Sequence, residues 1–254
     1  MTNFVSQIRR WPQGIRFYIG LTTVLVTAEM YWYTKSVYGD SNTAAIRLQD
    51  IYAWLSLSLI LLALAIGPLC SLLPNIRGKS LLRDARRLIG VSAAWFAAWH
   101  VGISYINQFK AANPLTLPAA YQRAFAVGAV AMLILLALAG TSFDAAFKRL
   151  GVWWFRLHRL IYLSVLLILF HAFAIGVRSV SWPYIGTLTL VIGLLFAAHL
   201  YLGFGPGKEP TILRSIVLCY GLLITIAVFA YGYSQHLGLS DIAGNSQGGQ
   251  YESR

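Results

Sequence analysis

The chain alternates between long apolar runs and short polar segments. Each apolar run is close to the roughly 20 residues that an α-helix needs to cross the hydrocarbon core of a membrane. Because lipid offers no hydrogen-bond partner to exposed main chain, these runs are predicted to be helices rather than strands. The sequence therefore predicts seven membrane-spanning helices, at about residues 14–37, 49–74, 87–108, 119–140, 150–177, 182–202 and 211–233.

The composition agrees with this pattern. Hydrophobic residues make up 58% and charged residues 11% of the 254 residues, whereas charged residues make up about a quarter of an ordinary soluble domain. We expect an all-α fold, a polytopic membrane helix bundle over residues 1–240, followed by a polar, flexible tail over residues 241–254. The chain holds no glycine-rich nucleotide-binding motif and no polar segment long enough for a nucleotide-binding domain.

Basic residues are distributed unevenly along the chain. The net charge of +12 would favour nucleic-acid binding in a soluble protein. Here fourteen of the twenty Lys and Arg residues precede the first predicted helix or lie around every second connection after it. Cytoplasmic loops of membrane proteins carry such an excess of basic residues. The distribution therefore predicts a cytoplasmic N-terminus and an external C-terminus, and it explains the charge without nucleic acid.

Four of the five histidines fall within the predicted helices: His100 in the third, His158 and His171 in the fifth, and His199 in the sixth. An ionisable residue within a membrane span is a functional candidate because its burial costs free energy. The alternative is a neutral ring whose nitrogens bond to main-chain carbonyls or hydroxyls. His236 follows the seventh predicted helix and is interpreted as a solvated loop residue.

Depth in the membrane separates these histidines. His158 and His171 are thirteen residues apart, which is about 20 Å along a helix that rises about 1.5 Å per residue. That distance is too long for one metal ion and suits two macrocyclic sites, one in each leaflet. Thirteen steps of about 100° also turn the two rings about 220° apart in an ideal helix. Either the helix is distorted or the two rings serve different neighbours.

His100 is predicted to lie in the outer half of the membrane, at the depth of His171. Two neutral imidazoles that face each other across a helix bundle are suitable axial ligands for a six-coordinate b-type haem. His158 has no histidine at its depth in the third helix, where Arg86 and Arg87 lie instead. His199, near the cytoplasmic end of the sixth helix, is the alternative partner of His158 for an inner haem.

Two stretches carry a family resemblance. DARRLIGVSAAWFAAWHVGISYI (84–106) joins a double arginine, a glycine and an aromatic run that ends in histidine. LALAGTSFDAAFKRLGVWWFRLHRLIYLSVLLILFHAF (136–173) joins Thr-Ser, a basic loop, Leu-Gly, tryptophan, Leu-His and a second histidine. The chain resembles the ferric-reductase-like transmembrane family, in particular its subgroup of haem-binding membrane subunits of bacterial methionine sulfoxide reductase systems. The family's six-helix core would span about residues 46–202.

The resemblance implies b-type haem and electron transfer across the bacterial cytoplasmic membrane, by an oxidoreductase subunit without its own nucleotide-binding domain. His100, His158 and His171 take the family's histidine positions and are the implied iron ligands. In the subgroup, electrons pass from a cytoplasmic flavin reductase, or from bound flavin such as FMN, to a periplasmic molybdopterin enzyme that repairs oxidised methionine. Arg87 and Arg159 could hold haem propionates or a flavin phosphate, although topological charge is their ordinary role.

The chain departs from the family in having one histidine in its third helix, where eukaryotic relatives have two, and in its predicted seventh helix and tail. Two other classes of protein stay open. A transporter or proton channel would use Glu29 and the histidines as a relay, although the helices show no inverted repeat. A scaffold subunit of a larger membrane complex would simply bury its histidines.

Overall fold

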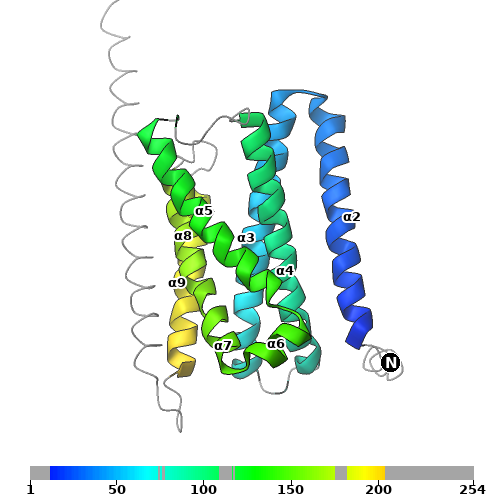
Figure 1. The fold of residues 1–254 in the computed structure, drawn as a ribbon, viewed down its shortest axis with the longest axis vertical. Coiled ribbons are helices and arrows are strands. Elements are labelled where there is room, and N and C mark those ends of the chain that lie inside the picture. Colours follow the sequence, from blue (N-terminus) through cyan, green and yellow to red (C-terminus); the bar gives the residue numbers. More distant parts are fainter. Residues whose placement is uncertain are drawn as a thin grey trace, which may run out of the picture. The chain divides into compact units, whose positions relative to one another are not determined.

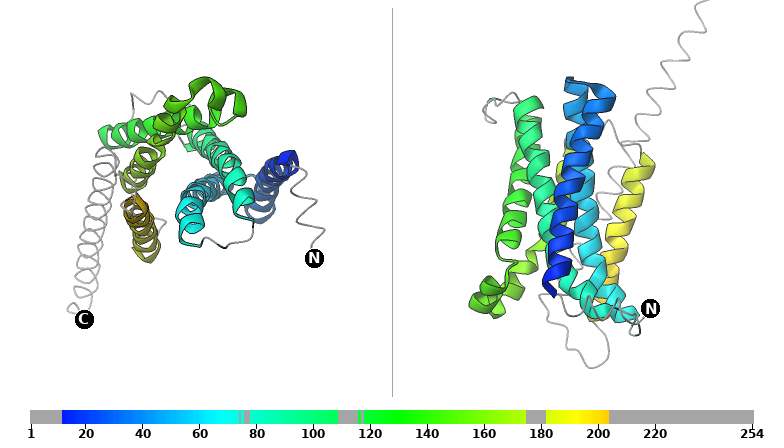
Figure 2. Two further views of the ribbon diagram at one scale, coloured as in Figure 1. Left: turned by 90° about the horizontal axis from the view of Figure 1, so that it is seen from below. Right: turned by 90° about the vertical axis from the view of Figure 1, so that its right-hand side faces the viewer.

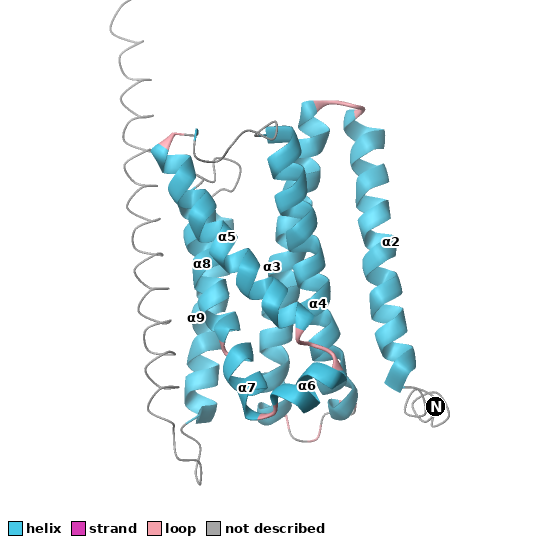
Figure 3. Cartoon of the chain, viewed as in Figure 1, coloured by secondary structure: helices cyan, strands magenta, loops and turns pink. Residues whose placement is uncertain are grey.

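The computed structural model describes residues 12–73, 75, 78–108, 116, 118–174 and 182–203. The part described is helical, with short turns and loops and no strand (Figure 1, Figure 3). Its main elements are α2 Pro12–Tyr38, α3 Asn42–Leu72, α4 Lys79–Ile103, the π-helix η1 Ser104–Gln108, α5 Ala119–Gly140, α6 Asp144–Leu150, α7 Val152–His158, α8 Leu160–Ala174 and α9 Trp182–Gly203. The chain divides into two compact units, Met1–Val165 and Leu166–Arg254.

The predicted all-α polytopic bundle is confirmed. Four described segments are long and apolar enough to cross a membrane, and they correspond to the second to fifth predicted helices: Asn42–Leu72, Lys79–Asn107, Tyr121–Gly140 and Val152–Ala172. α2 forms the first predicted helix, but it is not among these four segments.

The sixth predicted helix is α9, and Leu190–His199 is its apolar part with described side chains. The seventh predicted helix, the tail and His236 lie outside the described residues. The division into a bundle over 1–240 and a tail over 241–254 therefore stays a prediction.

The fifth predicted span, over residues 150–177, corresponds to the membrane segment Val152–Ala172, but its helix is distorted. The structure has two helices here, α7 and α8, with a turn at Arg159. The main-chain N–H of Arg159 donates to the Arg156 oxygen and that of Tyr162 donates to the Arg159 oxygen, both at 3.2 Å. These hydrogen bonds join residues three apart instead of four, so the chain is wound more tightly than an α-helix. The distortion lies directly after His158.

α3 and α4 form the main packing pair of the first unit, and α2 lies against both (Figure 2). Tyr52 of α3 is almost fully buried and packs on Phe96 of α4, with ring centroids 5.7 Å apart. Its hydroxyl donates to the main-chain oxygen of Thr27 on α2 at 2.8 Å. On the same face of α2, the hydroxyl of Thr23 lies 2.7 Å from the hydroxyl of Ser92 on α4. Hydrogen bonds of this kind join helices in lipid, where an unmade one costs free energy.

α6 and α7 lie at the end of the first unit where α2 and α4 begin (Figure 1). Gly151 separates them with a positive φ of 51°, a conformation that side chains with a Cβ rarely adopt. The carboxylate of Asp144, at the start of α6, accepts from Arg16 of α2 at 3.0 Å and from Arg87 of α4 at 2.8 Å. These contacts bring three chain segments together at the end that the charge pattern assigns to the cytoplasm.

Candidate functional site

His100 lies in the last turn of α4 and turns one ring nitrogen toward α3. Its Nδ1 lies 3.0 Å from the main-chain oxygen of Gln49. A carbonyl oxygen can only accept, so this contact favours the tautomer whose proton is on Nδ1. The lone pair is then on Nε2, and a histidine that binds a metal typically donates its other N–H in this way.

The surroundings of the His100–Gln49 contact are aromatic. Tyr52, about one turn along α3 from Gln49, packs on both Phe96 and Trp99. Trp95 packs edge-on against Trp99, with ring centroids 6.2 Å apart. Gln49 itself is buried, and its side-chain oxygen Oε1 has no hydrogen-bond partner among the described residues. A buried acceptor without a donor is costly and marks a place where a further polar group would fit.

His158 ends α7 and is held by Trp154, one turn earlier. The two rings stack with centroids 3.7 Å apart and an interplanar angle of 23°. The Nδ1 of His158 lies 3.0 Å from the main-chain oxygen of Trp154, and its Nε2 lies 3.5 Å from the Ser142 hydroxyl. His158 therefore has the same ring arrangement as His100, with Nδ1 on a carbonyl.

His171 and His199 belong to the second unit. His199 is 7% exposed in α9, and its Nδ1 lies 2.9 Å from the main-chain oxygen of Leu195. His171 is half-buried in the last turn of α8. The predicted pairs, His100 with His171 and His158 with His199, each join a residue of one unit to a residue of the other, and both pairs stay predictions.

Arg87 has a defined place beside His158, as the shared depth of the two residues predicts. Its guanidinium donates to Asp144 and lies over the rings of Phe147 and Trp154, with Cζ 4.9 and 5.2 Å from the centroids. The hydrogen bond from Arg16 and the positive charges of Arg16 and Arg87 hold the pKa of the Asp144 carboxyl below its ordinary value. Arg159, the other predicted arginine, is exposed in the turn after α7.

Three residues around these histidines are absent from the sequence-based prediction. Asp144 is the acid that joins Arg16 and Arg87, and its sequence signal is a single acidic residue in a basic loop. Trp154 stacks on His158, and a tryptophan near a membrane surface gives no sequence signal for such a contact. Gln49 gives no sequence signal, because it is its main chain that contacts His100.

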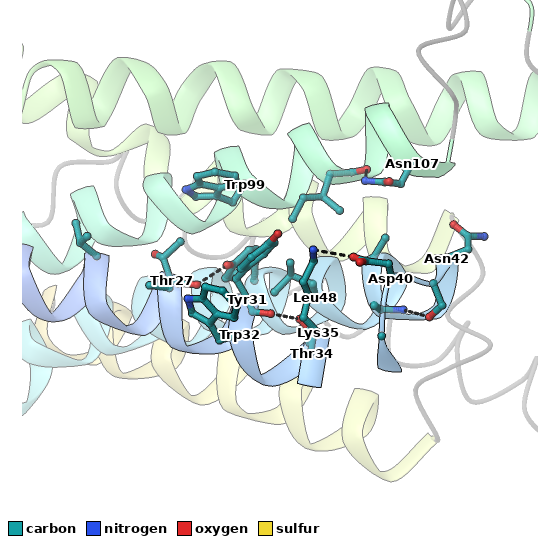
Figure 4. Close-up of a pocket in the computed structure, with 18 of the residues that line it drawn as sticks. Thr27, Tyr31, Trp32, Thr34, Lys35, Asp40, Asn42, Leu48, Trp99 and Asn107 are labelled. Carbon is teal, nitrogen blue, oxygen red and sulfur yellow. Dashed lines mark hydrogen bonds and ion pairs between the residues drawn. The ribbon is translucent and has the colours of Figure 1, made fainter. Parts of the chain in front are cut away.

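A pocket of about 830 Å³ lies among α2, α3 and α4 (Figure 4). Thr27 and Trp99 line one end, and Asp40, Asn42 and Asn107 line the other (Figure 4). Lys35 and Asp40 pair across 2.7 Å at the polar end. None of the predicted site residues is among the described residues that line this pocket, so the candidate site is at the histidines rather than in the pocket.

The described residues contain no group of three or more His, Cys, Asp or Glu side chains that could hold a metal ion. A haem makes no such demand, because its porphyrin supplies four ligands and the protein only one or two. Neutral histidines with Nδ1 on a main-chain oxygen supply the right donor atom for such a group. The residues present therefore fit a haem better than a bare metal ion.

The fold and these histidines define a multi-pass helical membrane protein with imidazoles set among its spans. The family model for the ferric reductase like transmembrane component matches residues 51–169. This part of the chain is similar to the ferric-reductase-like transmembrane family, as the sequence motifs predict. The matched region contains His100 and His158 and ends two residues before His171.

Several curated proteins are similar to this chain. The haem-binding subunit MsrQ of the protein-methionine-sulfoxide reductase of Cronobacter sakazakii is 36% identical over 127 residues, which is 49% of this chain and 61% of the relative. MsrQ of Xanthomonas campestris pv. campestris is 32% identical over 54% of this chain and 63% of the relative. MsrQ of Bordetella pertussis is 28% identical over 69% of this chain and 85% of the relative.

The chain thus spans about three-fifths of the length of the first two of these relatives. No solved structure matches it significantly.

Proposed function

We propose that this protein is a haem-binding electron-transfer subunit of the bacterial cytoplasmic membrane. The proposal is supported by the family match over residues 51–169 and by the similarity to relatives whose name states haem binding. His100 and His171 would hold one haem b in the outer half of the membrane. His158, with His199 as its partner, would hold a second, inner haem.

The observation that carries this proposal is the 3.0 Å contact between His100 Nδ1 and the Gln49 oxygen. It joins α4 to α3 and sets both the tautomer and the direction of the ring before any cofactor binds. A ligand held in this way loses little further freedom on binding. A haem held by two histidines would supply one-electron transfer, because neither axial position is left for oxygen.

The remaining residues of the chain would bind and orient the cofactors. Arg87, beside His158, and Arg159, in the turn that follows, carry positive charge that could pair with inner haem propionates or with the phosphate of FMN. The aromatic side chains around Tyr52 would exclude water from the His100 site, and a lower dielectric there strengthens every charge interaction with the haem.

The direction of transfer is proposed from the resemblance to the haem-binding subunits of methionine sulfoxide reductase systems. The predicted topology has the N-terminus in the cytoplasm and the C-terminus outside. Electrons would come from a cytoplasmic flavin or NAD(P)H-dependent reductase, because the chain has no nucleotide-binding motif of its own. They would leave to an acceptor on the outer side, which we propose is a periplasmic oxidoreductase subunit. The seven predicted helices would form a single haem-binding bundle over residues 1–240.

A reduced-minus-oxidised visible spectrum of the detergent-purified protein tests the proposal, with haem per chain measured as the pyridine haemochrome. We expect a sharp b-type α band and loss of the outer haem in both His100→Ala and His171→Ala. His236→Ala is the matched control, because His236 lies outside the predicted core, and it should keep every haem. A colourless protein after expression with ample haem would overturn the proposal.

A further inference from the structure

Trp154 makes several directional contacts with its neighbours. Its Nε1–H donates to the main-chain oxygen of Thr141 at 2.8 Å, which fixes the indole. Its ring stacks on His158, and its own carbonyl lies 3.0 Å from the Nδ1 of that histidine. Phe147 packs edge-on against the indole at 5.2 Å. The orientation of the His158 ring is thus set twice by one residue, through its ring and through its main chain.

The other side of the His158 ring is set by Ser142. The Ser142 hydroxyl donates to the Leu138 oxygen at 2.6 Å and lies 3.5 Å from His158 Nε2. The Trp154 carbonyl can only accept, so Nδ1 carries the proton in the neutral ring. Ser142 and Trp154 therefore hold the ring at its two nitrogens, and Trp154 also covers one face of the ring.

The indole of Trp154 also holds the positive charge of Arg87 near the His158 ring. Arg87 lies over the indole at 5.2 Å from Cζ to the centroid, and its Nη1 is 2.8 Å from Asp144 Oδ1. A guanidinium over an indole face is an attractive cation–π pair. A positive charge near a haem favours its reduced state, which carries one positive charge fewer, and the Asp144 carboxylate opposes that effect.

We propose that Trp154 is the positioning residue of the inner redox site, and that it holds the His158 ring and keeps the Arg87–Asp144 pair next to it. The inference rests on the proposed function, in which His158 binds the inner haem. Trp154 does not itself bind the iron. It acts through the orientation of His158 and through the charge that its indole face retains.

The test compares Trp154→Leu and Trp154→Phe with Trp153→Leu in the purified full chain. Trp153 is the matched control because it is the neighbouring tryptophan, is 67% exposed and contacts Arg156 instead. The measurements are the midpoint potential of each haem by spectroelectrochemistry and the low-spin g values by electron paramagnetic resonance, which report the orientation of an axial imidazole. His158→Ala is included to identify the inner haem.

We expect Trp154→Leu to shift the potential and the g values of the haem that His158→Ala removes, and to leave the other haem unchanged. Trp154→Phe should restore most of both values, because a phenyl ring can still stack, and Trp153→Leu should match the wild type. Wild-type values in Trp154→Leu at full haem content would overturn the positioning role while the proposed function stands. Retention of every haem in His158→Ala would instead overturn the inner site and this inference with it.

If Trp154→Leu does not accumulate in the membrane, Arg87→Gln and Asp144→Asn carry the test. Removing the cation should lower the midpoint potential of the inner haem, and removing the anion should raise it. Both shifts should shrink at high salt, because the Arg87 and Asp144 side chains are 31% and 54% exposed. Shifts in the same direction, or no shift in either variant, would contradict the proposed charge effect.

Discussion

His100 on α4 and Gln49 on α3 are 51 positions apart in the chain, and the histidine Nδ1 lies 3.0 Å from the glutamine main-chain oxygen. Because the acceptor belongs to the main chain, substitution of the Gln49 side chain leaves the contact in place. The side-chain oxygen of the same residue is buried without a partner among the described residues. The backbone and the side chain of Gln49 can therefore be tested separately.

Gln49→Leu should stabilise the protein or leave its stability unchanged, and it should keep the haem. A buried polar atom without a partner costs about 1–3 kcal/mol, and leucine removes that atom at similar volume. The measurement is the thermal unfolding midpoint by circular dichroism in detergent, together with haem per chain.

Gln49→Glu is the comparison for this prediction, because it puts an ionisable group at the same buried place and should lower the midpoint. Haem loss in Gln49→Leu at unchanged stability would show that the amide side chain itself takes part in binding.

Tyr52→Phe should destabilise the α2–α3–α4 packing only mildly. It removes the hydroxyl that donates to the Thr27 oxygen, and a hydrogen bond of this type contributes about 1 kcal/mol net. Tyr52→Ala also removes a ring that is 1% exposed and packs on Phe96, which should cost roughly 3–5 kcal/mol. Unfolding midpoints of the two variants provide the comparison, and equal losses would mean that the ring packing contributes nothing.

Gly151→Ala should destabilise the junction of α6 and α7 by about 1–3 kcal/mol, because a residue with a Cβ is strained at φ 51° and ψ −120°. Since α7 carries both Trp154 and His158, the inner haem should be lost at a lower temperature than the outer one. Absorbance of each haem during thermal unfolding measures this order.

Gly90→Ala is the control for that change. Gly90 lies within α4, and an added Cβ there meets no atom within 4 Å. Alanine is a better helix former than glycine by about 1 kcal/mol, so this variant should be at least as stable as the wild type. If both alanine variants behave alike, the positive φ of Gly151 is not the cause of any loss.

Asp144→Asn should weaken the junction of α2, α4 and α6 at neutral pH, but not in acid. The pKa of Asp144 is lower in the folded state than in the unfolded state, first because of the hydrogen bond from Arg16. Its contribution to stability is therefore complete above the ordinary aspartate pKa of about 3.9, and it is lost as the pH falls through the lower folded-state pKa. Unfolding midpoints of wild type and variant should differ at pH 7 and converge below about pH 4.

Asp84→Asn provides the reference for this series. Asp84 is an exposed residue of α4 that takes part in none of the ion pairs among the described residues. The unfolding midpoint of the Asp84→Asn variant should equal that of the wild type at every pH. A difference between Asp144→Asn and wild type that persists in acid would place the effect outside the ion pairs.

The sequence predicts the helices of this protein well and their details less well. Each of the first six predicted spans is helical in the structure over most of its length, because hydrophobicity summed over about 20 residues is a strong signal. The break at Arg159 has no such signal. It depends on a few main-chain hydrogen bonds, and no proline or glycine in residues 152–174 marks it.

The site shows the same division. The histidines stand out in the sequence because an ionisable residue among apolar ones is rare. Trp154 does not, since a tryptophan near a membrane surface is ordinarily part of an aromatic belt. Its position between Arg87 and His158 depends on α4 and α7 meeting, and Arg87 and Trp154 are 67 residues apart in the chain.

The sequence by itself determined the membrane class, the helical segments and the candidate haem ligands, because these follow from the properties of single residues and their local spacing. Only the tertiary structure decided that His100 turns its Nδ1 to the Gln49 carbonyl, that Trp154 stacks on His158, and that Asp144 joins Arg16 and Arg87. Arg16 and Asp144 are 128 positions apart in the chain. Contacts of this kind depend on which helix faces pack together, and a pattern along one chain does not contain that information.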